Sequence, residues 1–147
     1  MANGNIIFFG TPEICIPFLK KLEKNFNLQL IITQPDAWGG RNRKKKLVPA
    51  AKNFAIENNI EYLQPENLKD IKLVEKIESI DPVIGIVISY AKFIPRSIYK
   101  IPRHRIINVH FSMLPLYRGA APVQRAIENG DKSTGITIFE IIKKMDA

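Results

Sequence analysis

Cysteine is nearly missing from this sequence, in which Cys15 is the only one among 147 residues. A single cysteine cannot form a disulfide within the chain, which excludes the disulfide-stapled folds of small secreted proteins. Histidine is almost as scarce, since only His104 and His110 occur. The three residues lack the spacing of zinc ligands, so we expect no metal site. We expect Cys15 to fill a small apolar space and His104 to lie on the surface.

The sequence also lacks an amino-terminal signal. Residues 1–5 carry no basic side chain, and the apolar run of residues 6–9 is far too short for a signal peptide or a membrane span. We therefore expect a soluble, cytoplasmic protein that has no membrane partner.

The composition that remains is that of an ordinary folded domain. Hydrophobic residues make up 46% of the chain and charged residues 24%, which excludes a disordered or collagen-like protein. A chain of 147 residues is long enough to bury a core as a single domain. Lysine and arginine number 22, aspartate and glutamate number 14, and the formal net charge is +8.

More than half of this net charge comes from one short segment. Five positive side chains fall within six consecutive positions, namely Arg41, Arg43, Lys44, Lys45 and Lys46. Like charges repel, so the run favours an extended or mobile loop, and it attracts a polyanion through counterion release. The alternative is a solvated loop that only aids solubility.

Short β-branched and aromatic runs alternate with stretches of helical periodicity along the chain. Strands are predicted at residues 5–9, 28–33, 61–63, 82–88, 105–110 and 135–142. Helices are predicted after Pro12 and at residues 48–58, 68–79, 94–98 and 120–128, and residues 34–46 are predicted to form a long loop. This alternation indicates an α/β, Rossmann-like fold with a mostly parallel twisted sheet and helices on both faces. Ligands of such folds bind beyond the carboxyl ends of the strands.

The first strand ends in Phe9-Gly10-Thr11-Pro12, which is neither a dinucleotide-binding nor a P-loop motif. A later strand ends in Asn108-Val109-His110, whose two polar side chains point to the same face. Together they could donate hydrogen bonds to a carbonyl oxygen that gains negative charge. The alternative is a capping asparagine beside a structural histidine.

Asp146 follows the last predicted strand. A carboxylate just beyond a neighbouring strand could face His110, favour its cationic form and help to take a proton from an attacking amine. The alternative is a solvated acid near a frayed terminus.

Residues 108–124 read NVHFSMLPLYRGAAPVQ. This run resembles the signature of the 10-formyltetrahydrofolate-dependent formyltransferases, and its GAAPVQ ending is similar to the members that act on methionyl-tRNA. Residues 9–12 (FGTP), 33–36 (TQPD) and 134–137 (TGIT) fit the same family. The resemblance therefore covers nearly the whole chain.

The resemblance implies transfer of a formyl group from 10-formyltetrahydrofolate to the α-amine of methionine on initiator tRNA, for translation initiation, by a monomer without a metal. It implies that Asn108, His110 and Asp146 are catalytic. It implies a folate site formed by Ser112, Met113, Leu114, Pro115, Tyr90 and Lys92. It assigns the basic segment, residues 35–47, to tRNA binding through Arg41, Arg43, Lys44, Lys45 and Lys46.

Three departures from the family pattern stand out. Met113 replaces a usual leucine of similar volume, and Phe111 stands where a small residue is common, so Phe111 is expected to narrow the approach to the formyl group. The chain also ends at Ala147, whereas the family continues through more of the catalytic domain into a C-terminal β-barrel domain. Residues 1–147 are thus expected to be a truncated catalytic domain. Two other functions remain open: a sugar-nucleotide N-formyltransferase, and a catalytically inactive fragment.

Overall fold

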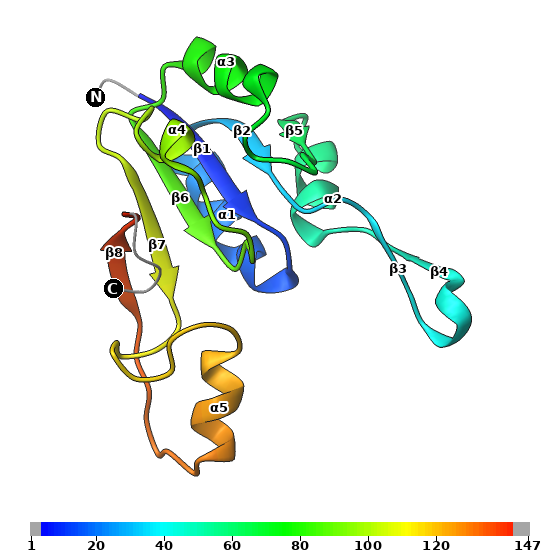
Figure 1. The fold of residues 1–147 in the computed structure, drawn as a ribbon, viewed down its shortest axis with the longest axis vertical. Coiled ribbons are helices and arrows are strands. Elements are labelled where there is room, and N and C mark those ends of the chain that lie inside the picture. Colours follow the sequence, from blue (N-terminus) through cyan, green and yellow to red (C-terminus); the bar gives the residue numbers. More distant parts are fainter. Residues whose placement is uncertain (1–3, 143–147) are drawn as a thin grey trace.

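The computed structural model of the chain describes residues 4–142, which are built around one six-stranded sheet (Figure 1). The strands lie in the order β5 (Glu61–Leu63), β2 (Asn27–Ile32), β1 (Asn5–Gly10), β6 (Ile84–Ile88), β7 (Ile106–His110) and β8 (Thr137–Glu140). All neighbours are parallel except β8, which runs antiparallel to β7. The predicted mostly parallel sheet is confirmed.

Helices cover both faces of this sheet, as predicted. The first helical layer consists of α1 (Ile16–Asn25) and α2 (Ala50–Glu57), and the second of α3 (Ile71–Ile80) and α4 (Arg96–Tyr99). The central strand β1 contributes alternate side chains to the two cores, with Phe8 under α1 and α2 and Phe9 under α3 and α4. A strand covered on both faces has to be apolar throughout, which explains the run of residues 6–9.

The turn after β1 packs tightly against the end of β6. A Cβ atom on Gly10 would lie 2.7 Å from the carbonyl oxygen of Ile88 and 2.7 Å from Cys15 Sγ, so a larger residue would not fit. Cys15 lies in a short 3-10 turn, η1 (Glu13–Cys15), and its thiol donates a hydrogen bond to the same carbonyl at 3.2 Å. Burial raises the pKa of this thiol to about 12. Cys15 is therefore a neutral core residue, as the sequence predicts.

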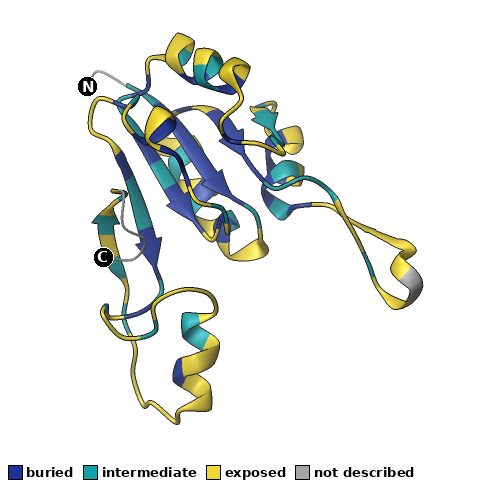
Figure 2. Cartoon of the chain, viewed as in Figure 1, coloured by how far each residue is buried: buried dark blue, intermediate teal, exposed yellow. Residues whose placement is uncertain are grey.

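The prediction of a long loop at residues 34–46 is wrong. The segment forms an antiparallel hairpin of β3 (Ala37–Gly39) and β4 (Lys45–Leu47), joined by a 3-10 turn, η2 (Arg41–Arg43). This basic hairpin projects away from the sheet (Figure 1) and is mostly exposed (Figure 2). Cross-strand backbone pairing in β3 and β4 fixes the cationic segment in spite of its like charges.

The part of the chain that follows β7 is less buried than the rest (Figure 2). It comprises a loop, the helix α5 (Pro122–Glu128) and β8. Large apolar side chains in this part are exposed, including Met113, Leu116, Ile127, Ile136 and Ile138. Throughout residues 4–142, we find no helix with the length and apolar character that crossing a membrane requires.

Candidate active site

The last strand of the parallel part, β7, carries two polar side chains on one face of the sheet. Ile106 belongs to the core under α3 and α4, and Asn108 pairs with Val87 of the same core. Because side chains alternate along a strand, Asn108 and His110 face the same side as Ile106. His110 is 8% exposed and is the last residue of β7. Both residues thus lie toward the carboxyl end of β7, where ligands of α/β sheets bind.

The imidazole of His110 is held by the loop that follows it. Its Nε2 atom lies 2.9 Å from the carbonyl oxygen of Tyr117. A carbonyl can only accept a hydrogen bond, so Nε2 carries the proton and Nδ1 is the nitrogen left for other chemistry. The carboxamide of Asn108 has no hydrogen-bond partner in the described part of the chain. Its N–H groups are therefore available to an acceptor from outside.

The loop after β7 is fixed by a threonine of the neighbouring strand. Thr137 is the cross-strand partner of His110, and its Oγ1 donates to the carbonyl oxygen of Ser112 at 2.7 Å. The Oγ1 atom of Thr137 also accepts a hydrogen bond from the backbone N–H of Leu114 at 3.0 Å. The buried hydroxyl of Ser112 donates to the carbonyl oxygen of Leu116 at 2.6 Å. The Thr137 side chain thereby holds Ser112 and Leu114, two of the four positions, Ser112 to Pro115, that the family resemblance assigns to folate.

Tyr117 anchors this loop at a second point. Its hydroxyl donates to Asp131 at 2.6 Å and accepts from Asn129 at 2.8 Å. The hydrogen bond to the Asp131 carboxylate raises the pKa of the Tyr117 phenol above its ordinary value. Since the Tyr117 carbonyl also contacts His110, this residue links the imidazole to the segment after α5. Tyr117 and Thr137 lie within the family motifs at residues 108–124 and 134–137, but the sequence alone gave neither of them a role, because contacts between distant segments leave no local pattern.

The segment after β6 contains the other two residues assigned to folate. Tyr90 is 1% exposed, and its ring packs edge-to-face on Phe9 with centroids 5.5 Å apart. Burial raises the pKa of Tyr90 to about 12, and its hydroxyl has no hydrogen-bond partner among the described residues. The ammonium of Lys92 donates to the carbonyl oxygens of Pro65 and Glu66 at 3.0 and 3.2 Å. Lys92 also lines a cavity of about 190 Å³ beside Phe93.

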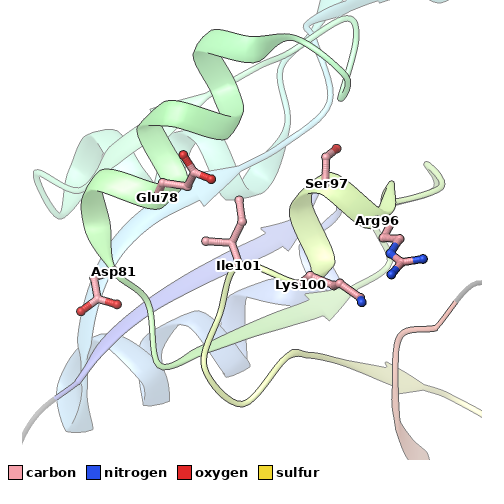
Figure 3. A pocket seen from close by; sticks show the side chains of 6 residues that line it. All are labelled: Glu78, Asp81, Arg96, Ser97, Lys100 and Ile101. Atoms are coloured by element: carbon pink, nitrogen blue, oxygen red, sulfur yellow. The ribbon is translucent and has the colours of Figure 1, made fainter.

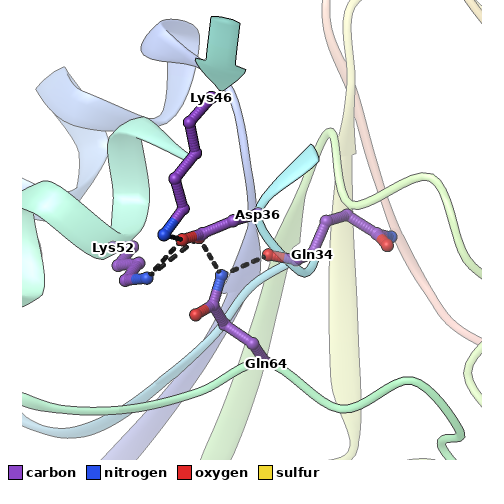
Figure 4. Close-up of polar contacts among 5 residues, drawn as sticks. All are labelled: Gln34, Asp36, Lys46, Lys52 and Gln64. Carbon is purple, nitrogen blue, oxygen red and sulfur yellow. Dashed lines mark hydrogen bonds and ion pairs between the residues drawn. The ribbon is translucent and has the colours of Figure 1, made fainter. Parts of the chain in front are cut away.

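The base of the basic hairpin is locked by Asp36, which lies just before β3 (Figure 4). This carboxylate binds the ammonium groups of Lys52 at 2.8 Å and of Lys46 at 3.1 Å. Gln64 donates to Asp36 at 2.7 Å and to the Gln34 carbonyl at 2.9 Å. Hydrogen bonds from Lys52 and Gln64 hold the pKa of Asp36 well below its usual range.

This lock reaches the Tyr90 segment as well, because Gln34 Nε2 donates to the Tyr90 carbonyl oxygen at 2.6 Å. Of the five cations assigned to RNA, Lys46 is thus paired within the protein. No ion pair is found within residues 4–142 for the other four, Arg41, Arg43, Lys44 and Lys45.

A larger hollow lies elsewhere, at the opposite end of the sheet. It has a volume of about 630 Å³ and lies between the end of α3 and α4 (Figure 3). It is lined by two acidic side chains, Glu78 and Asp81, and two basic ones, Arg96 and Lys100. Ser97 and Ile101 complete the lining. Since α3 leads into the amino end of β6, this hollow does not meet the carboxyl ends of the strands. We do not assign the site to it.

Comparisons with known proteins decide the family. The family profile described as formyl transferase matches residues 4–147. The chain belongs to the formyl transferase family.

Two curated relatives and one solved structure are similar to the chain over almost all of its length. The methionyl-tRNA formyltransferase of Thermodesulfovibrio yellowstonii is 43% identical over 99% of this chain and 47% of its own length. That of a Sulfurihydrogenibium strain is 44% identical over 97% of this chain and 46% of its own. The structure of phosphoribosylglycinamide formyltransferase from Bacillus halodurans matches 97% of this chain and 74% of its own, with a TM-score of 0.74 and 17% identity.

The chain therefore spans about half the length of the curated relatives that it matches. The match to the solved structure concerns the fold alone, and it confirms the predicted formyltransferase-type fold. Phosphoribosylglycinamide enzymes and a sugar N-formyltransferase share this fold, so the fold does not choose the substrate.

Asp146 lies outside the described residues, so its role stays a prediction. Phe111 does not lie on the His110 face: it packs against Phe18 of α1, with ring centroids 6.1 Å apart, beside the core under α1 and α2. The expectation that Phe111 narrows the approach to the formyl group is therefore wrong, because successive side chains of an extended segment point to opposite faces.

Proposed function

We propose that the chain takes part in formyl transfer from 10-formyltetrahydrofolate to the α-amine of methionine on initiator tRNA. The observation that carries this proposal is the pair Asn108 and His110, which share one face at the carboxyl end of β7. The names of the curated relatives support the same reaction.

Asn108 is proposed to bind the formyl oxygen. Its carboxamide N–H groups have no partner among the described residues, and they can donate to a carbonyl oxygen that becomes negative as an amine attacks. The folate co-substrate supplies the activated formyl carbon when it is bound. A fixed donor of this kind lowers the barrier because it needs no rearrangement when the charge develops.

His110 is proposed to assist from the same face. Its Nε2–H is used by Tyr117, so a second hydrogen bond to the formyl oxygen requires a proton on Nδ1, which is the cationic form. In the neutral form, Nδ1 is instead an acceptor that can take a proton from the attacking amine. Asp146, which the family resemblance implies is catalytic, is proposed to favour the cation.

The residues proposed to hold the folate fit a ligand that is flat, largely apolar and polar at its edges. The buried hydroxyl of Tyr90 lacks a partner among the described residues, and an unsatisfied hydroxyl costs about 1–3 kcal/mol. A polar group of the ligand could satisfy it. Met113 lies in the loop that Thr137 fixes, is 62% exposed and offers an apolar surface. The proposed set is Ser112, Met113, Leu114, Pro115, Tyr90 and Lys92.

The basic hairpin favours RNA over a sugar nucleotide as the acceptor. Arg41, Arg43, Lys44 and Lys45 are all exposed on it, and no acidic partner is found for them among residues 4–142. Each phosphate that such cations neutralise releases counterions, which strengthens binding to a long polyanion much more than to a single small anion.

A formyl-transfer assay on charged initiator tRNA tests the proposal. It is run on this chain and, in parallel, on this chain joined to the second half of the Thermodesulfovibrio yellowstonii relative. Replacing Asn108 by Ala should lower kcat by about 10²- to 10³-fold. His104→Ala is the matched control, since His104 is exposed and lies before β7. Absence of transfer by both forms, or near-normal turnover in the Asn108→Ala variant, would contradict the proposal.

A further inference from the structure

The histidine of the proposed site takes its orientation from a backbone group. Nε2 of His110 lies 2.9 Å from the carbonyl oxygen of Tyr117, and no hydrogen bond of Nδ1 is found within residues 4–142. A neutral imidazole carries its proton on either nitrogen, so the partner of one nitrogen decides what the other can do. With the proton on Nε2, Nδ1 is free to act as a base. The position of the Tyr117 carbonyl therefore selects the nitrogen of His110 that serves the reaction.

Tyr117 presents this carbonyl in an uncommon backbone conformation. Its φ angle is +53°, which lies in the left-handed region that residues with a Cβ atom rarely adopt. Such a conformation costs free energy, and it persists only where the surrounding contacts hold it. Because the dihedral angles of a residue orient the peptide plane that follows it, a return of Tyr117 to an ordinary conformation would rotate its carbonyl relative to His110.

The contacts that hold the Tyr117 side chain come from the end of α5. Its hydroxyl donates to the Asp131 carboxylate at 2.6 Å and accepts from the Asn129 carboxamide at 2.8 Å. The N–H groups of Gly130 and Asp131 return to carbonyl oxygens of α5 at 2.9 and 3.0 Å, and Gly130 has a φ angle of +73°. This is the usual ending of a helix at a left-handed glycine. A well-defined turn thus presents Asn129 and Asp131 to the Tyr117 hydroxyl.

We propose that Asp131 is a positioning residue for formyl transfer. Through the Tyr117 hydroxyl it holds the Tyr117 carbonyl against Nε2, which leaves Nδ1 of His110 to the attacking amine. This inference rests on the proposed function, since it identifies what selects the working nitrogen of that site. No hydrogen bond joins Asp131 to the imidazole within residues 4–142, so its effect passes through Tyr117. The ionised acceptor makes the hydrogen bond from the phenol stronger than a neutral acceptor would.

NMR spectroscopy of the chain with ¹⁵N-labelled histidine tests the proposal without the reaction. The chain has two histidines, so the exposed His104 serves as an internal reference. In the wild type we expect His110 to show the Nε2–H tautomer and an N–H proton that exchanges slowly with water. Tyr117→Phe keeps the ring but loses the hydroxyl. In this variant the His110 proton should exchange about 3- to 10-fold faster, and the Nδ1–H tautomer should become detectable.

Substitutions of Asp131 grade the effect. Asp131→Ala removes the acceptor and should behave as Tyr117→Phe does. Asp131→Asn keeps an amide oxygen that can accept the same hydrogen bond, so it should stay closer to the wild type. Tyr62→Phe is the matched control, because Tyr62 lies on β5 at the far edge of the sheet and no hydrogen bond of its hydroxyl is found in the described part of the chain. It should leave the signals of His110 unchanged.

Kinetics of formyl transfer separate positioning from mere support of the loop. The loop before Tyr117 contains residues proposed to bind folate, so an anchor with only a structural role would raise KM for the folate when it is lost. Loss of a correctly placed Nδ1 would instead lower kcat. In the two forms of the chain that the Asn108→Ala experiment uses, Tyr117→Phe and Asp131→Ala should each lower kcat by about 3- to 10-fold, with KM for the folate nearly unchanged.

Three results would overturn the positioning role of Asp131. They are a wild-type His110 that lacks the Nε2–H tautomer, His110 signals that are unchanged in both Tyr117→Phe and Asp131→Ala, and a raised KM with normal kcat in these variants. Faster exchange in both variants without formyl transfer by the wild type supports control of the imidazole by Asp131 and contradicts the proposed reaction. Formyl transfer by the wild type with normal kcat in both variants supports the reaction and overturns the positioning.

Discussion

Replacing Thr137 by Val tests whether β8 supports the site. The two side chains have nearly the same shape, but valine lacks the hydroxyl that bonds the Ser112 carbonyl and the Leu114 N–H at 2.7 and 3.0 Å. Both backbone groups would lose a partner in a half-buried place, which costs about 1–2 kcal/mol. Since about 1.4 kcal/mol is a factor of ten, the loop should open about 5- to 30-fold more often.

Native-state hydrogen exchange measures this opening directly. The Leu114 amide should exchange about 5- to 30-fold faster in the Thr137→Val variant, while amides of β1 keep their rates. If the loop binds folate as proposed, the affinity for a folate analogue should fall by up to the same factor. Thr134→Val is the control, because Thr134 is exposed and no side-chain hydrogen bond of it is found within residues 4–142. Unchanged exchange at Leu114 would refute the reasoning.

Three further predictions concern other parts of the molecule. Replacing Asp36 by Asn removes the carboxylate that two lysines share, so trypsin should cut the hairpin faster at neutral pH, as followed by mass spectrometry. Because the pKa of Asp36 is lowered, the stability that this carboxylate contributes is complete above about pH 4 and is lost at lower pH. The difference in urea midpoint between the wild type and the Asp36→Asn variant should therefore become smaller below about pH 4. Phe111→Ala removes half-buried packing against Phe18 and should lower the free energy of unfolding in urea by about 2 kcal/mol. Formyl transfer should be retained, and a large loss of kcat in the folded variant would place Phe111 in the reaction. The Cys15 thiol, whose pKa is about 12, should react with iodoacetamide at pH 8 only after unfolding, and fast alkylation of the native chain would contradict its burial.

The two central strands, β1 and β6, could be predicted because coverage by helices on both faces makes them almost uniformly apolar. Residues 82–88 were expected to form a central strand, and β6 (Ile84–Ile88) lies between β1 and β7. The shared face of Asn108 and His110 likewise follows from the two-residue period of a strand. These features depend only on local sequence, which is why pattern analysis finds them.

The hairpin could not be predicted by the same reasoning. Its two strands have three residues each and mix Ala, Trp, Gly, Lys and Leu without an alternating apolar pattern. What fixes it is the set of contacts that Asp36 makes with Lys52 and Gln64, which come from α2 and from the segment after β5. A contact between distant segments leaves no local signal, so the like charges of the run pointed instead to a loop.

The direction of β8 changes the reasoning about Asp146. Alternating apolar residues predict a strand but not its direction, since parallel and antiparallel strands share the same period. Because β8 is antiparallel, it begins beside His110 and ends at the other end of β7, where the Ile141 N–H donates to the Ile106 carbonyl at 2.8 Å. The argument that a residue just beyond this strand would face His110 therefore fails, and the assignment of Asp146 rests on the family resemblance alone. The residue that β8 does bring next to His110 is Thr137, from the start of the strand, and this is why the hydroxyl of Thr137 supports the loop on which the proposed folate site depends.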